Sequence, residues 1–262
     1  MANCDYENEF IKKTREGMSE SIDTNLIAVR GFDIRGIREE KEDCILVIGL
    51  NPAGDEKDAI REREDRTYLY SLGSVAVKKD QPKWFYNTYY RPIFDLAQSV
   101  RPDGAKWPWC NLDWKEIQSE IEGTELGDFE AEIKSEYEEH RNCRCTIYIG
   151  DMFYYHDKKS KRIPYKKEWS DQRYSEYCWD MLDMHIRKLF YYKKTVQFVY
   201  INSAKVSRWL CGEQQKTHKI RVVDGCEVPV FFGPMLSSGN TDLFSMLRLS
   251  NEIKQVLWGG KL

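Results

Sequence analysis

The stretch Ile45–Glu56, ILVIGLNPAGDE, decides the fold of this 262-residue chain. It opens with four apolar residues in a row, the pattern of a strand that other elements cover on both faces. The run stops at Gly49, and Asn51, Pro52 and Gly54 then predict a tight turn. Open α/β sheets bind their ligands beyond the carboxyl ends of their strands. We therefore predict that a ligand binds at this turn.

Composition and charge favour a soluble, cytoplasmic globular protein. Hydrophobic residues make up 41% of the chain and charged residues 32%, and the N-terminal segment is strongly charged. A membrane-spanning helix needs a run of about 18 apolar residues, and none is present, so we expect neither a membrane span nor a secretory signal. The formal net charge of −3 lacks the basic excess of a strong nucleic-acid binder.

The cysteines predict free thiols rather than disulfides or a metal site. All eight are scattered along a chain that is long enough to be stabilised by burial alone. Cys143 and Cys145 form a CxC pair, which is not the spacing of the common zinc sites. We therefore expect no metal and no cofactor.

A basic cluster interleaved with aromatic residues follows residue 153. It comprises Lys158, Lys159, Lys161, Arg162, Lys166 and Lys167, with Tyr154, Tyr155, Tyr165 and Trp169. Such a cluster can contact phosphates and bases. The alternative is a solvated loop whose amphipathic aromatic side chains cover the core, and this alternative is the more common one.

Three further apolar segments predict strands, and each ends near polar residues. They are Cys145–Ile149, Val196–Ile201 and the VPVFF segment at 228–232, with polar ends at Asp151, at Asn202 and Ser203, and at Ser237, Ser238 and Asn240. Helical periodicity lies between them. This repeated order predicts an α/β three-layer sandwich with a mostly parallel central sheet of about four strands. We expect residues 44–262 to form this single domain and residues 1–43 an N-terminal arm.

The helical segments show which residues should be buried. Apolar residues repeat at helical spacing from Ile93 to Val100, and again across Tyr177–Phe190, where His185 falls on the apolar stripe. His185 is therefore interpreted as a core residue rather than a catalyst. For the last helix, the predicted buried side consists of Leu243, Met246, Leu247, Ile253 and Leu257.

Several common catalytic motifs are absent from the sequence. It contains no GxxxxGK[ST], no GxGxxG after a strand, no GxSxG and no HExxH. These absences count against nucleotide hydrolysis, NAD chemistry, serine hydrolysis and zinc proteolysis. The remaining candidate for a functional site is an Asn-Pro turn opposite a loop rich in serine and asparagine.

This arrangement resembles the uracil-DNA glycosylase superfamily. In that family a G-x-[ND]-P motif follows the first core strand, as GLNP does at Gly49–Pro52. A middle strand then ends in a polar residue, here Asp151, and a later strand leads into a helix of small residues, here within VYINSAKVSRWL. A final strand precedes a loop and the last helix, as in VPVFFGPMLSSGNTD. The similarity covers residues 44–258 in the order of elements, and GLNP is its sharpest motif.

The resemblance implies an N-glycosylase that acts on a base flipped out of the DNA stack. Asn51 would position the attacking water, Asp151 would read the edge of the base, and Tyr68 or Tyr70 would stack on it. The residues implied to contact the substrate are Gly49, Pro52, Ala53, Gly54, Tyr68, Tyr70, Asp151, Ser237, Ser238 and Asn240. The expected partner is DNA or a nucleobase-containing small molecule, and we expect a monomer.

The sequence departs from the family at the last motif. A histidine that stabilises the departing base is missing, because the chain reads GPMLS at 233–237. Preorganised donors of this kind contribute roughly 3 to 4 kcal/mol. His156 is a candidate replacement, although a histidine beside lysines on a loop is more often solvated. Asp151 stands where an amide is frequent, which favours a base edge that carries donors.

Two other hypotheses stay open on the sequence alone. The chain can be a nucleic-acid or nucleotide-binding module of the same fold that has lost its catalytic activity. It can also be an unrelated α/β domain in which Asn51 and Pro52 only start a helix, since asparagine is a common N-cap and proline a common first helical residue.

Overall fold

The protein is described here by a computed structural model. The structure describes residues 2–20, 22–29, 41–52, 54–57, 59–60, 90–100, 114–123, 127–140, 145–157, 165–212, 217–236 and 242–259. Within these ranges, none of the helices combines the length and the hydrophobicity needed to cross a bilayer.

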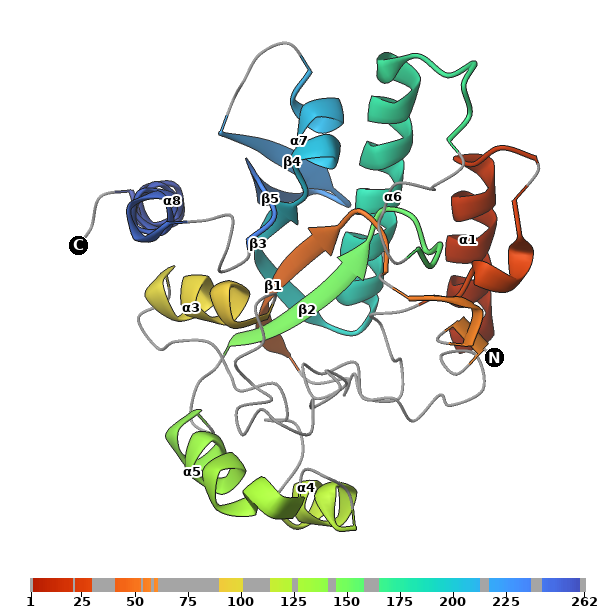
Figure 1. Ribbon diagram of the computed structural model, residues 1–262. Helices are drawn as coiled ribbons and strands as arrows, with labels where there is room; N and C mark the ends of the chain where they lie inside the picture. Colours follow the sequence, from red (N-terminus) through yellow and green to blue (C-terminus); the bar gives the residue numbers. More distant parts are fainter. Residues whose placement is uncertain are drawn as a thin grey trace.

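A five-stranded sheet forms the centre of the molecule (Figure 1). Its strands are β1 (Glu42–Gly49), β2 (Cys145–Asp151), β3 (Lys194–Asn202), β4 (His218–Val223) and β5 (Cys226–Gly233). They lie in the order β2-β1-β3-β5-β4, and the first four of this order are mutually parallel. β4 is antiparallel to β5 and forms one edge. The prediction of a mostly parallel α/β sheet is confirmed.

The fifth strand comes from a hairpin. β4 and β5 are joined by Asp224 and Gly225, whose φ values are 49° and 81°. Positive φ at both central residues is the conformation of the two-residue turn that suits twisted strands, and Asp-Gly is a favoured sequence for it. The first arm of this hairpin adds the antiparallel edge strand β4.

Helices cover both faces of the sheet (Figure 1). One face carries α1 (Ala2–Glu16), α6 (Asp171–Tyr191) and α7 (Ala204–Cys211), and the other carries α3 (Tyr90–Val100) and α8 (Leu243–Trp258). Smaller elements are η1 (Thr24–Leu26), α4 (Trp114–Ile121), η4 (Gly127–Phe129) and α5 (Glu130–His140). A sheet between two helical layers is the three-layer architecture expected when parallel strands are connected by helices.

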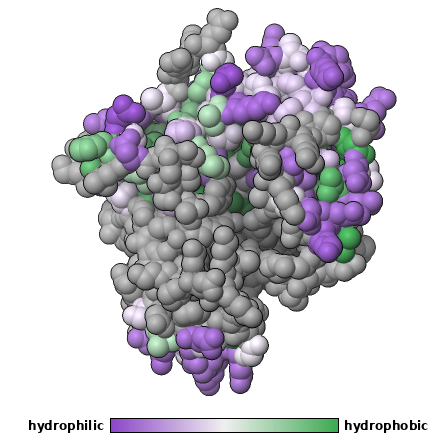
Figure 2. All heavy atoms as spheres, in the orientation of Figure 1, coloured by the Kyte–Doolittle hydropathy of each residue, from purple (hydrophilic) through white to green (hydrophobic). Residues whose placement is uncertain are grey.

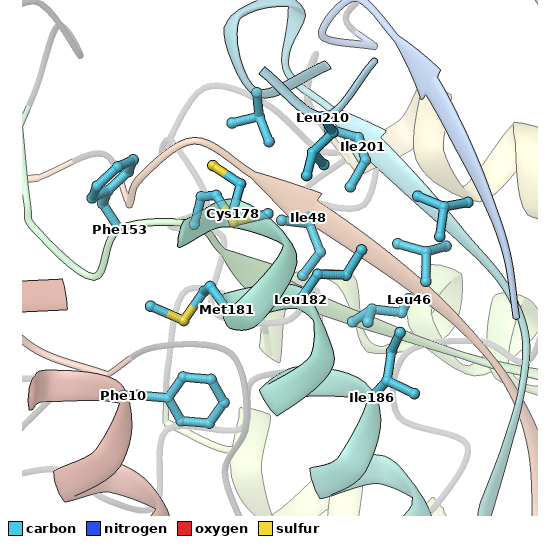
Figure 3. Close-up of a cluster of buried hydrophobic side chains, with 14 of the residues drawn as sticks. Phe10, Leu46, Ile48, Phe153, Cys178, Met181, Leu182, Ile186, Ile201 and Leu210 are labelled. Atoms are coloured by element: carbon cyan, nitrogen blue, oxygen red, sulfur yellow. The ribbon is translucent and has the colours of Figure 1, made fainter. Parts of the chain in front are cut away.

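The first core lies between the sheet and α6. Figure 3 shows Leu182 of α6 beside Leu46 and Ile48 of β1, all of them buried. Phe10 of α1 reaches the same core and lies near Met181. Burial of an aliphatic or aromatic side chain of this size contributes about 1.5 to 3 kcal/mol. The N-terminal helix is therefore packed into the core of the sheet domain.

The second core lies between the sheet and α3 with α8. The predicted stripe Ile93–Val100 is buried against it, and so is Ile253 of α8. Leu247 was predicted to be buried, and this is wrong, because it is 50% exposed. Phe244 is also exposed, so the first turns of α8 do not reach the core with these side chains. The surface over α4 and α5 is mostly hydrophilic (Figure 2).

Three helices begin at side-chain caps. Ser170 accepts from the backbone N–H of Arg173 at the start of α6, and Asp242 accepts from that of Ser245 at the start of α8. Ser203 caps α7 by accepting from Val206 N–H. Each such cap is worth about 1 kcal/mol.

His185 is buried in the first core, as its place on the apolar stripe predicted. Its Nδ1 lies 2.7 Å from the carbonyl oxygen of Met181, so Nδ1 carries the proton. Its Nε2 then accepts from the hydroxyl of Tyr154 at 2.8 Å. Burial lowers the pKa of His185 to about 3. The ring is therefore neutral and has a structural role.

This histidine predicts a loss of stability in acid. The unfolded chain binds a proton at His185 below about pH 6.5, whereas the folded chain resists protonation down to about pH 3, so stability falls as the pH drops between these values. We expect His185 to account for about 2 kcal/mol of lost unfolding free energy between pH 7 and pH 5. Urea denaturation at the two pH values measures it. His185→Gln, which cannot be protonated, should show a smaller difference; an unchanged difference would contradict the prediction.

Candidate functional site

The carboxyl ends of four strands meet at one edge of the sheet. Gly49 of β1 is in register with Asp151 of β2, and Asn202 of β3 is in register with Gly233 of β5. β1 and β3 are themselves parallel and paired up to Ile48. Two of the predicted polar strand ends, Asp151 and Asn202, therefore lie at the same end of the sheet.

Asp151, Gly49, Asn202 and Gly233 form a row across this edge, which we call the strand-end row. Side chains alternate between the two faces of a strand. The residues that precede the row by two or four positions pack in the second core: Ile45, Val47, Ile147, Ile149, Phe198, Tyr200 and Phe231. The row therefore belongs to the face covered by α3 and α8. Two polar residues alternate in it with two glycines, so Gly49 places no side chain between Asp151 and Asn202.

Asn51 follows β1, an interior strand of the sheet, and is held through its amide nitrogen. Nδ2 donates to the carbonyl oxygens of Pro52 and Tyr155, both at 3.0 Å. Because carbonyl oxygens only accept hydrogen bonds, these contacts fix which end of the amide is the nitrogen. Oδ1 is buried and has no hydrogen-bond partner among the described residues. The Asn-Pro turn therefore presents an oriented acceptor.

Backbone hydrogen bonds hold the turn in place. The N–H groups of Met152 and Phe153 donate to the carbonyl oxygens of Gly49 and Leu50 at 3.0 and 2.9 Å. Asp157 N–H donates to Pro52 at 3.2 Å. The chain after β2 thus runs beside the chain after β1, beyond the end of the sheet. This pairing is rigid support for Asn51, because the same segment supplies the Tyr155 carbonyl oxygen.

Asn202 was predicted as a polar strand end but not as a site residue. The N-cap of α7 is its neighbour Ser203. The Oδ1 atom of Asn202 accepts from the N–H of Leu236, in the chain that leaves β5. Its Nδ2 has no partner among the described residues, although the residue is only 2% exposed. The signal available in the sequence was its place directly at a strand end.

Tyr200 fixes the start of the chain after β5. Its hydroxyl donates to the carbonyl oxygen of Pro234 at 2.8 Å, and burial raises its pKa, so the donor stays protonated. A Cβ atom at Gly233 would overlap this hydroxyl, so only glycine fits there. Ser207 of α7 adds a hydrogen bond to the Gly233 carbonyl oxygen at 3.0 Å. Leu236, whose N–H meets Asn202, is thus held on a fixed segment.

His156 and Asp151 are both buried. His156 is 1% exposed, so the alternative of a solvated histidine is wrong for this residue. Its backbone N–H donates to Leu26 of the N-terminal segment at 2.8 Å, and its neighbour Tyr155 holds Asn51. Asp151 is also largely shielded from water. Whether His156 donates to a substrate stays a prediction.

Other predicted site residues divide into two groups. Pro52 is buried and Gly54 is half-buried directly after Asn51, at the expected place. Ala53, Tyr68, Tyr70, Ser237, Ser238 and Asn240 lie outside the described residues. The proposed stacking and phosphate contacts therefore stay predictions.

The basic and aromatic cluster is partly an internal structure. Tyr154 and Tyr155 are buried in the first core. The ammonium group of Lys205 lies 3.5 Å from the ring centroid of Tyr165, and partial burial lowers the pKa of this lysine. Trp169 is half-buried between nearby cations. For these residues the second interpretation, aromatic side chains that cover the core, fits the packing.

The edge of the sheet offers complementary hydrogen-bonding groups but no metal centre. Within the described ranges, no group of three or more histidine, cysteine or acidic residues is arranged to hold a metal ion. Among the described residues, Asn51 Oδ1 is a buried acceptor without a partner and Asn202 Nδ2 a buried donor without a partner, and Asp151 is a buried carboxylate at the end of β2.

Comparison with known proteins assigns no family. No protein-family model matches this sequence, and no curated protein matches it significantly. The function is therefore inferred from the residues and the geometry of the strand-end row and of Asn51.

The two carbonyl contacts of Asn51 predict how Asn51→Asp will behave. A carboxylate cannot donate to Pro52 and Tyr155, so we expect the variant to lose about 1 to 3 kcal/mol of unfolding free energy at about pH 7. Protonation of the introduced carboxylate restores one donor. The loss of unfolding free energy relative to wild type should therefore be smaller at about pH 5. Urea denaturation of both proteins at each pH measures this. A deficit that is independent of pH would contradict the assigned orientation of the amide.

Proposed function

We propose that this protein is a uracil-DNA glycosylase-like enzyme that hydrolyses the N-glycosidic bond of a base flipped out of DNA. The proposal places the flipped base over the strand-end row, with Asn51 beside the reacting carbon. It rests on the GLNP motif at Gly49–Pro52 and on the order of the strands and helices that follow it.

The observation that carries the proposal is the state of the Asn51 amide. Both hydrogen bonds of Nδ2 are made within the protein, and the buried Oδ1 keeps its capacity to accept. An oxygen atom with these properties can hold a water molecule by accepting a hydrogen bond from one of its O–H groups. Water held in one orientation reacts faster than free water, because part of the entropy of alignment is already lost.

The reaction needs only water and the nucleotide. The bond between C1′ and the base nitrogen breaks, and its electron pair leaves with the base. The water oxygen bonds to C1′ and releases a proton to solvent, while the base anion takes up a proton from solvent. In this scheme Asn51 positions the water, and it neither gains nor loses a proton.

Recognition of the base is assigned to Asp151. Its carboxylate lies at the end of β2, in register with Gly49, and an ionised carboxylate only accepts hydrogen bonds. It therefore selects a base edge that carries an N–H donor. Gly49 has no side chain, so no side chain of β1 stands between Asp151 and Asn202 in this row.

The test is excision of bases from synthetic DNA. The full-length protein is incubated with oligonucleotides that contain uracil, hypoxanthine or a mismatched base, and abasic sites are detected by strand cleavage in alkali. We expect abasic sites with at least one of these substrates. Asn51→Ala should lower the single-turnover rate by roughly 100-fold, because the attacking water loses its acceptor.

The matched control is Asn25→Ala, which removes an exposed side chain of the same type from η1 and should leave the rate unchanged. If no substrate yields abasic sites and Asn51→Ala behaves like wild type, the enzymatic proposal is wrong. Salt-sensitive binding of modified single strands without turnover would instead favour the binding module that has lost its catalytic activity.

A further inference from the structure

The buried amide of Asn202 carries an inference that concerns the departing base. When a glycosidic bond breaks, negative charge develops on the base and spreads to its ring carbonyl oxygens. A preorganised N–H donor in a water-excluded place stabilises such a charge more than water does. The sequence provides no histidine for this task in its last loop, which reads GPMLS at 233–237.

Asn202 combines three properties of such a donor. It is 2% exposed, its Oδ1 is used by the N–H of Leu236, and its Nδ2 has no partner among the described residues. A buried N–H group without a partner costs about 1 to 3 kcal/mol, so its presence needs an explanation. A ligand atom that accepts from it provides one.

The surroundings prevent the amide from turning its donor elsewhere. The Leu236 N–H can only donate, so the atom it meets must be the oxygen. The chain that carries Leu236 is itself anchored through Pro234, whose carbonyl oxygen accepts from Tyr200. A donor that is fixed before the reaction needs no reorganisation during it.

Asn202 lies beside the place that we propose for the base. Asn202 belongs to the strand-end row, where Gly49 separates it from Asp151. Asp151 and Asn202 thus lie on the two strands that flank β1, on the same face of the sheet. A carboxylate on one side and an N–H donor on the other complement a base edge that pairs a ring N–H with a carbonyl oxygen.

We propose that Asn202 donates from Nδ2 to a carbonyl oxygen of the departing base, and that the substrates are therefore bases with such an oxygen. This role rests on the proposed function. The electron pair of the broken bond reaches the carbonyl oxygen by delocalisation through the ring, and Asn202 stabilises the resulting anion without transferring a proton.

The decisive variant is Asn202→Asp, which keeps an oxygen for Leu236 N–H and removes the donor. Single-turnover excision is measured for wild type and variant with uracil and with 5-fluorouracil in the same duplex. The fluorinated base is the more stable anion and needs less stabilisation. We expect the variant to be slower by roughly 100-fold on uracil and by clearly less on 5-fluorouracil.

Ser207→Ala is the matched control, because it removes hydrogen bonds to Gly233 in the same chain segment without touching the donor. It should slow the two substrates equally or leave both unchanged. If Asn202→Asp also affects both substrates equally, or neither, while Asn51→Ala abolishes excision, the role of Asn202 is wrong and the proposed function stands.

A binding measurement tests the donor when turnover is absent. If the wild type releases no base, the proposed function fails. Calorimetric titration with free uracil and free 5-fluorouracil then decides whether Asn202 donates a hydrogen bond to a base. Binding that Asn202→Asp weakens by tenfold or more supports a donor to the base. Binding that the substitution leaves unchanged, or no binding of either base to the wild type, overturns the inference.

Discussion

The parallel pairing of β1 with β2 on one side and with β3 on the other is the constraint on which the rest depends. Parallel strands must all end at the same edge, so residues that are distant in the sequence are brought together there without any specific contact between them. Asp151 and Asn202 become neighbours of Gly49 for this reason. Helical layers on both faces then exclude water from the sheet, which makes the hydrogen bonds at its edge stronger and an unpaired polar group there more costly.

Support for the edge comes from the chain segments just beyond the strands. The segment after β2 pairs with the segment after β1 and supplies the carbonyl oxygen that orients Asn51. On the other side, Tyr200 and Ser207 hold the chain after β5, and that chain orients Asn202 through Leu236. The two asparagines are thus fixed by different parts of the fold. One presents an acceptor and the other a donor, and the proposed reaction uses both.

Most of the layered fold follows from local patterns. Periods of two and of about 3.6 residues identify strands and helices, and the Asp224-Gly225 turn identifies the hairpin. The spacing of apolar residues predicts burial less well where burial depends on which other elements pack against the helix. Leu247 has the spacing of a buried residue, but it is half exposed. His156 shows the opposite case, because it is buried although Lys158 and Lys159 follow it closely, and its backbone N–H donates to Leu26 of the N-terminal segment.

The sequence by itself determined that two strands end in polar residues, that Asn51 follows an apolar strand, and that His185 is a core residue, because each of these depends on residues close together in the chain. Only the tertiary structure decided which atoms of Asn51 and Asn202 remain available. Apart from the adjacent Pro52, their partners lie more than 30 positions away, at the carbonyl oxygen of Tyr155 and the N–H of Leu236. Contacts over such separations are set by strand order and register, and no local pattern encodes them.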